Sequence, residues 1–302
     1  MMGATQKRTV LVTGCSAGGA GHALALEFAA RGLRVFATAR STSSLTGLAE
    51  KGIETFALDV TKAESIATLK REITARTGGK LDILYNNAGM IYQIPAIEAD
   101  PAKVRQMYDT NVFGLFDMVT AFTPLLLASV KDSQLPPTIV NVASVLARMP
   151  LIFSAAYNAS KAAVVQYSDT LRLEVGPLGI KVVTLYMGEV STGLMHAGSV
   201  KFGPNSIYAD FEARVQNANE KHARETMKAD EFARKVVSQV VDKKPGAGVG
   251  EYLWLGTNAF IVWLLNAVGP RKVFDGTSEG MVGFNDKGLK KVLFARGQQS
   301  QI

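Results

Sequence analysis

The chain has 302 residues, of which 47% are hydrophobic and 20% charged, with a formal net charge of +7. This composition is typical of a globular protein with a large core and excludes a disordered chain. The positive charges are dispersed, and the nearest approach to a cluster, residues 287–291, is typical of a solvated helix face, so no nucleic-acid partner is expected.

The cysteine content and the N-terminal residues bear on the cellular compartment. Cys15 is the single cysteine, which excludes an intramolecular disulfide. Residues 1–9 lack the charged-then-apolar order of a secretory signal and are expected to form a short disordered lead. We therefore expect a cytoplasmic protein.

Short apolar runs alternate with longer amphipathic stretches along the chain. Because the runs are hydrophobic throughout rather than at every second position, they are typical of parallel strands covered on both faces. We therefore predict an α/β fold with a doubly wound, Rossmann-type parallel sheet flanked by helices on both faces. The runs span residues 9–13, 34–39, 53–60, 81–86, 138–144 and 180–186, and the helical stretches begin near residues 19, 62, 101, 154 and 229.

The domain organisation follows from the same alternation. No linker, repeat or low-complexity tract interrupts it, so one domain is predicted over residues 8–270, followed by a C-terminal tail over 271–302. Residues 193–228 break the pattern with mixed polarity and several glycines. They are expected to form an excursion over the ligand site.

Residues 252–270 form an uncharged run that allows three interpretations. A membrane span is disfavoured because glycine, threonine and asparagine interrupt the run. A last strand followed by a helix in the core or at a subunit interface is favoured. Peripheral membrane contact stays open, and with it a location at the endoplasmic reticulum or a lipid droplet.

A glycine-rich segment, TGCSAGGAG at 13–21, follows the first apolar run directly and precedes a helical stretch. In this context glycines allow a tight turn and a close approach of the backbone to a pyrophosphate, whose charge the N–H groups of the helix start can bind. The segment therefore predicts a dinucleotide site.

The end of the second run indicates which dinucleotide binds. An acid at this position bonds the ribose 2′-hydroxyl, whereas a cation accepts a 2′-phosphate. The chain has Ala39 and Arg40 here, and a guanidinium matches phosphate geometry. NADPH is therefore expected rather than NADH.

Two further motifs follow the third and fourth runs, where ligands of open α/β sheets bind. Asp59 and Val60 close the third run, and NNAG at 86–89 closes the fourth. We expect both to line the adenosine pocket.

Tyr157 and Lys161 lie four residues apart in a helical stretch, so their side chains leave the same helix face. A free phenol has a pKa of about 10, and a neighbouring ammonium favours the phenolate. We therefore expect Lys161 to lower the pKa of Tyr157 and to make it an effective acid near neutrality.

In this order, the glycine-rich segment, Asp59-Val60, NNAG, Asn111, Ser144 and YNASK resemble the short-chain dehydrogenase/reductases over residues 8–195. The pattern is most similar to fungal NADPH-dependent 1-acyldihydroxyacetone phosphate reductases and related reductases of secondary metabolism. The resemblance implies that Tyr157 donates a proton to the substrate oxygen, that Ser144 hydrogen-bonds this oxygen, and that Lys161 binds the nicotinamide ribose. It also implies that Asn111 holds a water in a proton relay.

The motifs and the resemblance together define the expected site. The expected cofactor-binding residues are Gly14, Ser16, Gly19, Ala20, Gly21, Arg40, Asp59, Val60, Asn87, Ala88, Gly89, Tyr157, Lys161, Val190 and Thr192. An apolar substrate pocket is expected from Met90, Tyr92, Leu146, Met149, Phe153, Met187, Leu194 and Met195.

Two features depart from the family pattern. The glycine-rich segment has one extra residue, which leaves the individual roles of Gly18 and Gly19 open. Met187 stands where the family has a proline, so the loop before Val190 and Thr192 is expected to be less rigid.

The expected activity is reduction of a hydrophobic ketone, either an acyl-lipid ketone or a secondary-metabolite ketone, with NADPH. A non-catalytic NADPH-binding redox sensor and the reverse oxidation of an alcohol with NADP⁺ are the alternatives, and retention of Ser144, Tyr157 and Lys161 favours the enzyme. The resemblance implies a homo-oligomer, a dimer or tetramer. The spacing of His22, His196 and His222 fits no metal site, so no metal is expected.

Overall fold

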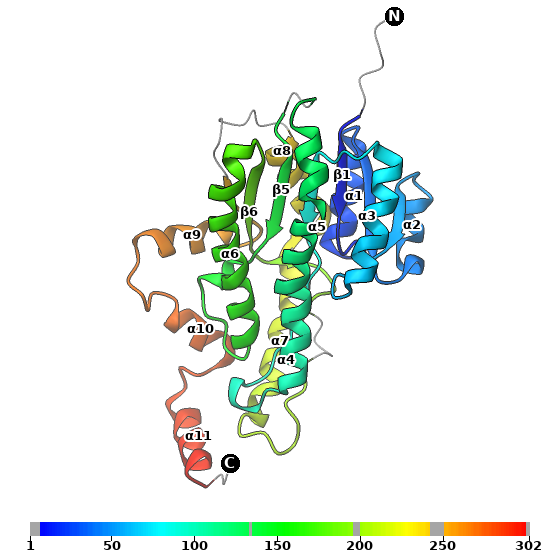
Figure 1. The fold of residues 1–302 in the computed structure, drawn as a ribbon. Helices are drawn as coiled ribbons and strands as arrows, with labels where there is room; N and C mark the ends of the chain where they lie inside the picture. Colours follow the sequence, from blue (N-terminus) through cyan, green and yellow to red (C-terminus); the bar gives the residue numbers. More distant parts are fainter. Residues whose placement is uncertain (1–6, 133–134, 196–199, 242–250, 300–302) are drawn as a thin grey trace, which may run out of the picture.

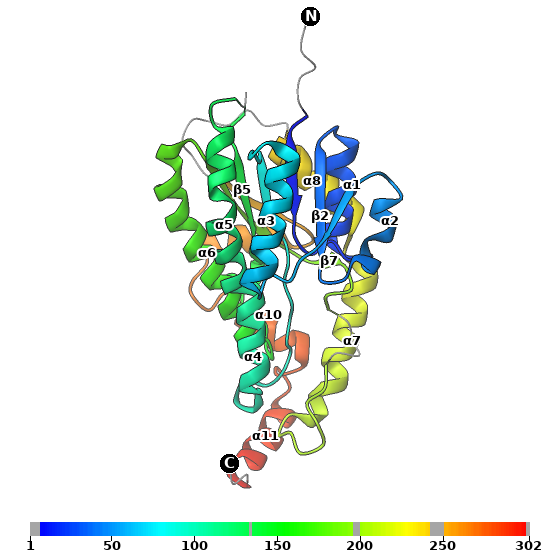
Figure 2. The same ribbon diagram turned by 45° about the vertical axis from the view of Figure 1, so that its right-hand side comes forward.

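The computed structural model describes residues 7–132, 135–195, 200–241 and 251–299. Seven parallel strands form one sheet in the order β3-β2-β1-β4-β5-β6-β9 (Figures 1 and 2). The first six strands follow the doubly wound order, so the predicted fold class is confirmed. The strands are β1 (Thr9–Val12), β2 (Arg34–Ala39), β3 (Glu54–Ala57), β4 (Ile83–Asn86), β5 (Thr138–Val142), β6 (Lys181–Met187) and β9 (Glu251–Leu255).

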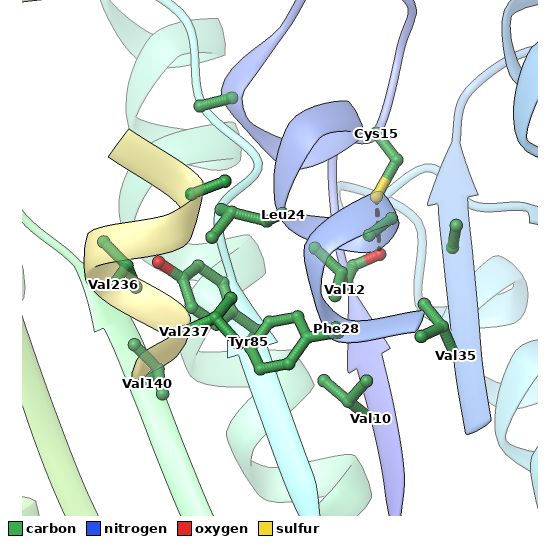
Figure 3. Packing of buried hydrophobic residues seen from close by; sticks show 14 of the residues in the cluster. Val10, Val12, Cys15, Leu24, Phe28, Val35, Tyr85, Val140, Val236 and Val237 are labelled. Atoms are coloured by element: carbon green, nitrogen blue, oxygen red, sulfur yellow. Dashed lines mark hydrogen bonds between the residues drawn. The ribbon is translucent and has the colours of Figure 1, made fainter. Parts of the chain in front are cut away.

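Helices cover both faces of the sheet, which explains why the strands are apolar at every position. In β1, Val10 and Val12 join the hydrophobic cluster on one face, and Leu11 joins the cluster on the other. The first face is covered by α1 (Ala20–Ala30) and α8 (Ala229–Val241), whose side chains pack around Tyr85 in Figure 3. The second face is covered by α3 (Ala63–Thr77), α5 (Gly114–Ser129) and α6 (Ala155–Val175).

Several predicted runs extend beyond the strands at their carboxyl ends. β1 ends at Val12, β3 at Ala57 and β5 at Val142, whereas the runs continue to Thr13, Val60 and Ser144. The first residue after each of these strands still donates to the neighbouring strand, as Thr13 N–H does to the Tyr85 carbonyl (3.0 Å). The longer runs therefore follow the chain to the carboxyl edge of the sheet.

The segment after β6 holds the smaller elements. A two-stranded sheet joins β7 (Val190–Ser191) to β8 (Met227–Lys228), and between them runs the 17-residue helix α7 (Ala209–Glu225). The predicted excursion over 193–228 thus contains a long helix, and its residues 196–199 lie outside the described part. Short elements elsewhere are η1 (Thr42–Leu45), α2 (Thr46–Ala49), η2 (Ala96–Glu98), α4 (Pro101–Tyr108), a π-helical turn η3 (Asp109–Phe113), η4 (Val145–Ala147) and η5 (Gly176–Leu178).

The C-terminal residues form α10 (Asp275–Val282) and α11 (Lys287–Gln299), which lie beyond the end of the sheet (Figure 1). Val282, Phe284 and Leu293 pack in a cluster with Phe153 and Phe211. Residues 275–293 therefore pack onto the region around α7. The boundary at residue 270 stays a prediction, as does the disordered lead, most of which lies outside the described residues.

The uncharged run 252–270 is divided between β9 and α9 (Ala259–Val268). A helix of ten residues is about 15 Å long, half the thickness of a bilayer core. Among the described residues, one helical stretch, Pro101–Ser129, is long and apolar enough to cross a membrane by length and composition, and half of it is buried in the protein. Leu115, Met118 and Phe122 of this stretch pack on the sheet, as in a core helix.

Candidate active site

A cleft of about 1360 Å³ opens at the carboxyl ends of the strands. β1 and β4 are neighbours, although the chain runs from β1 to β2 on one side and continues from β4 to β5 on the other. At such a reversal of strand order the connecting loops diverge and leave a crevice. The cleft wall combines these loops with residues of α7, α9 and α10.

The glycines of the loop after β1 are required by backbone geometry. Gly14 has φ +74°, and an added Cβ would lie 2.9 Å from Ala88 Cα. Gly21, in the first turn of α1, would place a Cβ 2.6 Å from Asn87 Nδ2 and in overlap with the Gly14 carbonyl oxygen. Both positions exclude any side chain because the start of α1 lies close to the ends of β1 and β4. A pyrophosphate site requires this close approach of the backbone.

The structure also assigns the two glycines that the sequence left open. Gly18 has φ +75° with open space around it, so it makes the left-handed turn. Gly19 is the residue that precedes α1. Gly14, Ser16, Gly19 and Ala20 line the cleft, whereas Gly21 lies behind it.

Thr13 connects β1 to β4 and was not singled out from the sequence. Its hydroxyl accepts hydrogen bonds from the N–H groups of Asn87 and Ala88, both 3.0 Å long. Asn87 Nδ2 in turn donates to the carbonyl oxygens of Thr13 (2.9 Å) and Gly14 (3.1 Å). The NNAG motif thus holds the phosphate loop in place, and Asn87, Ala88 and Gly89 line the cleft as expected.

Arg40 lies at the cleft where β2 ends. Hydroxyl groups surround this corner: Ser44 Oγ donates to Ser16 Oγ (3.3 Å) and to the Ser41 carbonyl oxygen (2.7 Å), while the Ser44 carbonyl accepts from Ala17 N–H. A guanidinium beside several hydroxyls fits a phosphate group. The serines after Arg40 were missed in the sequence, although the run RSTSS is the signal that could have found them.

Asp59 and Val60 form the wall beside this corner. Burial acts to raise the pKa of Asp59, but hydrogen bonds from Thr61 and the charges of Lys62 and Arg40 outweigh it and lower the pKa below its usual value. The carboxylate is therefore ionised at neutral pH. It accepts hydrogen bonds from the Thr61 hydroxyl (2.7 Å) and N–H (3.1 Å), which fixes the turn.

Ser144 and Tyr157 meet across the cleft. Ser144 follows β5 and caps η4 by accepting from Leu146 N–H (3.1 Å), while Tyr157 projects from the first turn of α6. Both side chains line the cleft and are buried, at 6% exposure each, and the Ser144 hydroxyl acts to lower the pKa of Tyr157 as a hydrogen-bonding neighbour. A carbonyl oxygen placed between them would meet two hydroxyl donors.

The expectation that Lys161 lowers the pKa of Tyr157 is wrong for the chain alone. Burial raises the pKa of Tyr157 to about 12, and only the hydrogen bond with Ser144 opposes this. Burial also lowers the pKa of Lys161 to about 8. Lys161 Nζ lies 5.9 Å from the centre of the Tyr157 ring and donates to the Val142 carbonyl (2.8 Å), so desolvation dominates at both groups.

Asn111 lies in the π-helical turn between α4 and α5 and is buried behind the cleft. Its Oδ1 accepts from Met90 N–H (2.8 Å), and its Nδ2 donates to the Met90 carbonyl (2.9 Å) and to Ser160 Oγ (3.2 Å). It thus joins the NNAG loop to α6. π-helical turns are frequent at functional sites, and the relay role of Asn111 stays a prediction.

The loop after β6 is hydrogen-bonded to the segment that follows β9, and its lower rigidity stays a prediction. In place of a proline, Met187 extends the pairing of β6 with β9. Gly188 N–H then donates to the Leu255 carbonyl (2.8 Å), and Glu189 and Thr257 exchange two backbone hydrogen bonds of 3.0 and 2.9 Å. Val190 and Thr192, which follow directly, line the cleft.

Most of the expected apolar lining residues are in the cleft wall, but two are not. Phe153 has φ +63°, and its ring contacts Phe202, Tyr208 and Phe284 in a separate aromatic cluster. Tyr92 packs on the same cluster. Short distance in sequence from a motif does not fix the direction of a side chain. The residues confirmed in the wall are Met90, Leu146, Met149, Met187, Leu194 and Met195.

The sequence missed the other half of the wall. It comes from residues that follow position 200 and carry no motif, on α7, α9 and α10, so no local signal could have found it. These residues include Arg214, Val215, Ile261, Val262, Leu265, Phe274, Met281 and Val282.

No metal centre is visible in the ranges that the structure describes. Within these ranges, no three His, Cys, Asp or Glu side chains gather where they could hold a metal ion. His196 lies outside these ranges. His222, which lies in the cleft wall, contacts Glu189 and the Val190 carbonyl oxygen.

Comparison with known proteins gives the same picture. The sequence model of the short chain dehydrogenase family matches residues 8–200. Short-chain dehydrogenase virD of Hypocrea virens is 37% identical over 89% of this chain and 90% of its own length. An NADPH-dependent 1-acyldihydroxyacetone phosphate reductase of Schizosaccharomyces pombe is 36% identical over 83% and 86%.

A solved structure extends the comparison to the fold. A short chain dehydrogenase from Burkholderia cenocepacia, crystallised in complex with NADP, superposes with a TM-score of 0.67 at 25% identity and covers 90% of this chain and 98% of its own. The family match covers more than half of the chain, and the relatives are similar over nearly their full length. The chain therefore belongs to the short-chain dehydrogenase family of oxidoreductases.

Proposed function

We propose that this protein is an NADPH-dependent reductase that transfers hydride to a ketone of a hydrophobic substrate, with Tyr157 as proton donor. The observation that carries the proposal is the meeting of Ser144 and Tyr157, with Lys161 one helical turn away, in the cleft that also contains the glycine loop and Arg40. The same arrangement supports turnover over a non-catalytic NADPH sensor, because a sensor needs no donor pair.

The cleft fits a phosphorylated dinucleotide. Gly14 and Gly21 let the backbone of the loop and the start of α1 approach β4 closely, and the N–H groups at the start of α1 suit a pyrophosphate. Arg40 with the hydroxyls of Ser16 and Ser44 suits a 2′-phosphate. The S. pombe relative is named as NADPH-dependent and the B. cenocepacia relative binds NADP, which supports NADPH over NADH.

When bound, NADPH supplies the hydride that reduces the substrate carbon. Ser144 and Tyr157 hold the substrate oxygen by hydrogen bonds, and Tyr157 delivers the proton as negative charge develops there. With a pKa near 12 in the chain alone, Tyr157 is neutral and carries its proton before the reaction. Lys161, whose ammonium lies next to Gly89 in the cleft wall, holds the nicotinamide ribose.

The substrate is proposed to be apolar because the wall beyond Tyr157 carries Met90, Leu146, Met149 and Met281. An acyl-lipid ketone agrees with the name of the S. pombe relative, and a secondary-metabolite ketone suits the same wall. Reduction is proposed as the direction because cells keep the phosphorylated cofactor reduced, and the reverse alcohol oxidation with NADP⁺ is the alternative.

A cytoplasmic location with peripheral contact to a membrane, such as the endoplasmic reticulum or a lipid droplet, is also proposed. α9 exposes Phe260 (65%), Trp263 (42%) and Val268 (75%), while its Val262 faces the cleft. Arg271 and Lys272 follow directly, and an apolar helix flanked by cations suits an anionic lipid surface. Sedimentation with anionic vesicles tests this: wild type should sediment and Phe260→Ser/Trp263→Ser should not.

A homo-oligomer, either a dimer or a tetramer, is proposed on the family relationship. Exposed apolar side chains on α5 and α6, Leu127 (38%) and Leu173 (64%), provide a surface that a second copy could cover. Light scattering during size-exclusion chromatography gives the mass directly. A monomer at micromolar concentration would contradict this part of the proposal.

The central experiment follows NADPH consumption with a panel of acyl ketones and cyclic ketones. Wild type should turn over at least one ketone, and Tyr157→Phe should lose about 10³-fold in kcat, the typical contribution of a general acid. Tyr208→Phe, which removes a hydroxyl outside the cleft wall, is the matched control and should retain activity. Unchanged turnover in Tyr157→Phe would remove the proposed acid.

A further inference from the structure

The loop from Gly188 to Thr192 connects the proposed donor Ser144 to α7. At its start, Ser144 Oγ donates to the Met187 carbonyl (3.4 Å). On the side of α9, the backbone of Gly188 and Glu189 is paired with Leu255 and Thr257. On the other side β7 pairs with β8, and α7 ends against β7 (Figure 2).

His222, in the last turn of α7, contacts this loop with its side chain, next to a hydrogen bond that Ser191 Oγ donates to the Ala223 carbonyl (2.5 Å). Its Nδ1 lies 3.2 Å from Glu189 Oε2, and its Nε2 lies 3.2 Å from the Val190 carbonyl oxygen. The second carboxylate oxygen, Glu189 Oε1, accepts from Asn258 Nδ2 (2.7 Å). Three segments, α7, the loop and the turn before α9, are therefore joined through one carboxylate and one imidazole ring.

Both ring nitrogens of His222 thus face an oxygen acceptor. A neutral imidazole has one N–H and can satisfy one of them, whereas the imidazolium donates to both. The ring is largely buried, at 9% side-chain exposure, so water does not readily replace a missing donor. The hydrogen bond from His222 also holds the pKa of Glu189 below its usual value, so the carboxylate is ionised.

Other charges lie on the elements around the ring. α7 carries Lys221, Arg224 and Glu225 next to it, and Lys221 pairs with Glu225 at 3.7 Å. β8 contributes Lys228, whose Nζ donates to the Arg224 carbonyl (3.4 Å). Of the carboxylates on these elements, Glu189 is the one that contacts the ring.

We propose that His222 is a positioning residue whose imidazolium form bridges Glu189 and the Val190 carbonyl and thereby fixes the loop that faces the nicotinamide half of the cofactor. The inference rests on the proposed function, because it takes the cleft as the NADPH site. His222 does not touch the reacting atoms. It acts through Val190 and Thr192, and through the Met187 carbonyl that Ser144 contacts.

The protonation of the ring can be tested without any activity. In the full chain labelled with ¹⁵N-histidine, NMR at about pH 6 should show both ring nitrogens of His222 protonated, because each of them faces an oxygen acceptor. In Glu189→Gln, which removes the carboxylate, a smaller share of the ring should be doubly protonated at the same pH. A neutral ring at pH 6 in wild type would overturn the bridge.

The consequence for the cofactor is tested by NADPH titration in His222→Gln, with Glu220→Gln on the same helix but outside the cleft wall as matched control. At pH 6 we expect a Kd for NADPH about fivefold higher in His222→Gln, with a smaller change in kcat, since one charge-assisted hydrogen bond is lost. The ratio of the two Kd values isolates the effect of His222, because the other groups of the complex are the same in both proteins.

Glu189→Gln is a second variant, and it retains the side-chain volume. Together with the double variant it completes a double-mutant cycle. The effects of Glu189→Gln and His222→Gln on Kd should be non-additive, because each removes the same bridge. If wild type binds NADPH and His222→Gln has the same Kd at every pH, the inference is overturned and the proposed function stands. If wild type does not bind NADPH, the proposed function fails, while the NMR titration still decides whether the bridge exists.

Discussion

The two halves of the cleft are built in different ways. The cofactor half consists of backbone turns at strand ends, where Gly14 and Gly21 exclude any side chain and Thr13 and Asn87 connect β1 to β4. The substrate half consists of side chains, from Met90, Leu146 and Met149 on one side and from α7, α9 and α10 on the other, supported by the aromatic cluster around Phe153. The shape of the cofactor half is set by the path of the backbone, and the shape of the substrate half is set by the side chains that line it.

This difference implies unequal tolerance to change. A substitution in the cofactor half displaces backbone that several hydrogen bonds hold in place, so it should weaken NADPH binding strongly. A substitution in the substrate half alters the shape of one part of the wall. It should change the KM for the ketone and leave NADPH binding intact. Variants in each half, measured for the Kd of NADPH and the KM of the ketone, test this difference.

The largest effect is expected from Gly21→Ala. The added Cβ would lie 2.6 Å from Asn87 Nδ2 and would push α1 away from the Gly14 carbonyl. Overpacking of this kind costs about 1–3 kcal/mol, so the Kd for NADPH should rise up to about 100-fold. Gly47→Ala in α2, where the nearest atom is His22 Cε1 at 3.9 Å, is the matched control. Fluorescence titration with NADPH measures both, and equal Kd values would show that the loop accepts a side chain.

The next effect concerns Lys161, where the two halves meet. Burial lowers its pKa to about 8, whereas the unfolded chain returns it to about 10.4. Between these values the unfolded chain binds more protons, so this group makes the free energy of unfolding rise with pH, by about 3 kcal/mol in total. Tyr157, with its pKa raised to about 12, acts in the opposite direction only above about pH 10.

Lys161→Met should therefore be more stable than wild type at about pH 7, with an advantage that shrinks toward about pH 10. Urea unfolding of the cofactor-free chain at several pH values measures this difference. Lys51→Met, an exposed lysine outside the cleft wall, is the control and should show no such trend. A constant difference between Lys161→Met and wild type would mean that the buried amine is not desolvated.

Arg40→Ala should have a smaller effect that is confined to one group of the cofactor. Loss of a charge-assisted contact to the 2′-phosphate is worth about 2 kcal/mol, so the preference for NADPH over NADH should fall about 30-fold. Arg71→Ala on α3 leaves the corner with Ser16 and Ser44 intact and is the control. Kd values for both cofactors give the ratio. If Arg40→Ala kept the full preference for NADPH over NADH, groups other than Arg40 would bind the 2′-phosphate.

The same contrast explains what the sequence could predict. Parallel strands with two buried faces leave continuous apolar runs, and the turn at Gly14 and Gly21 needs glycine at fixed positions, so both appear as local patterns. The signal for the donors is equally local, because Tyr157 and Lys161 share a helix and Ser144 follows a strand by two residues.

The part of the substrate wall that comes from α7, α9 and α10 could not be predicted for the converse reason. Ile261, Phe274 and Met281 reach the cleft only through the packing of α9 and α10, a contact between segments distant in sequence that leaves no periodic signal. The prediction of a lowered pKa for Tyr157 was wrong for a similar reason. The spacing of Tyr157 from Lys161 is local, but the burial of Tyr157 depends on the whole fold. Local patterns thus predict the cofactor half and the donors but not their environment.

The smallest effect is expected from Phe153→Leu, which tests the support of the substrate half. Leucine at φ +63° is as strained as phenylalanine, so the change isolates the ring and its contacts with Phe202, Tyr208 and Phe284. A loss of about 1 kcal/mol in this cluster should raise the KM for the ketone about fivefold.

The Kd for NADPH should stay within about twofold in Phe153→Leu, since none of the aromatic rings that contact Phe153 lines the cleft. Phe56→Leu on β3, whose ring packs on Phe36 away from the cleft, is the matched control for loss of an aromatic contact. Steady-state kinetics and NADPH titration on the same preparations separate the two ligands. An equal loss of affinity for both in Phe153→Leu would show that the halves respond as one unit, because the aromatic cluster would then support the loops of the cofactor site as well as the substrate wall.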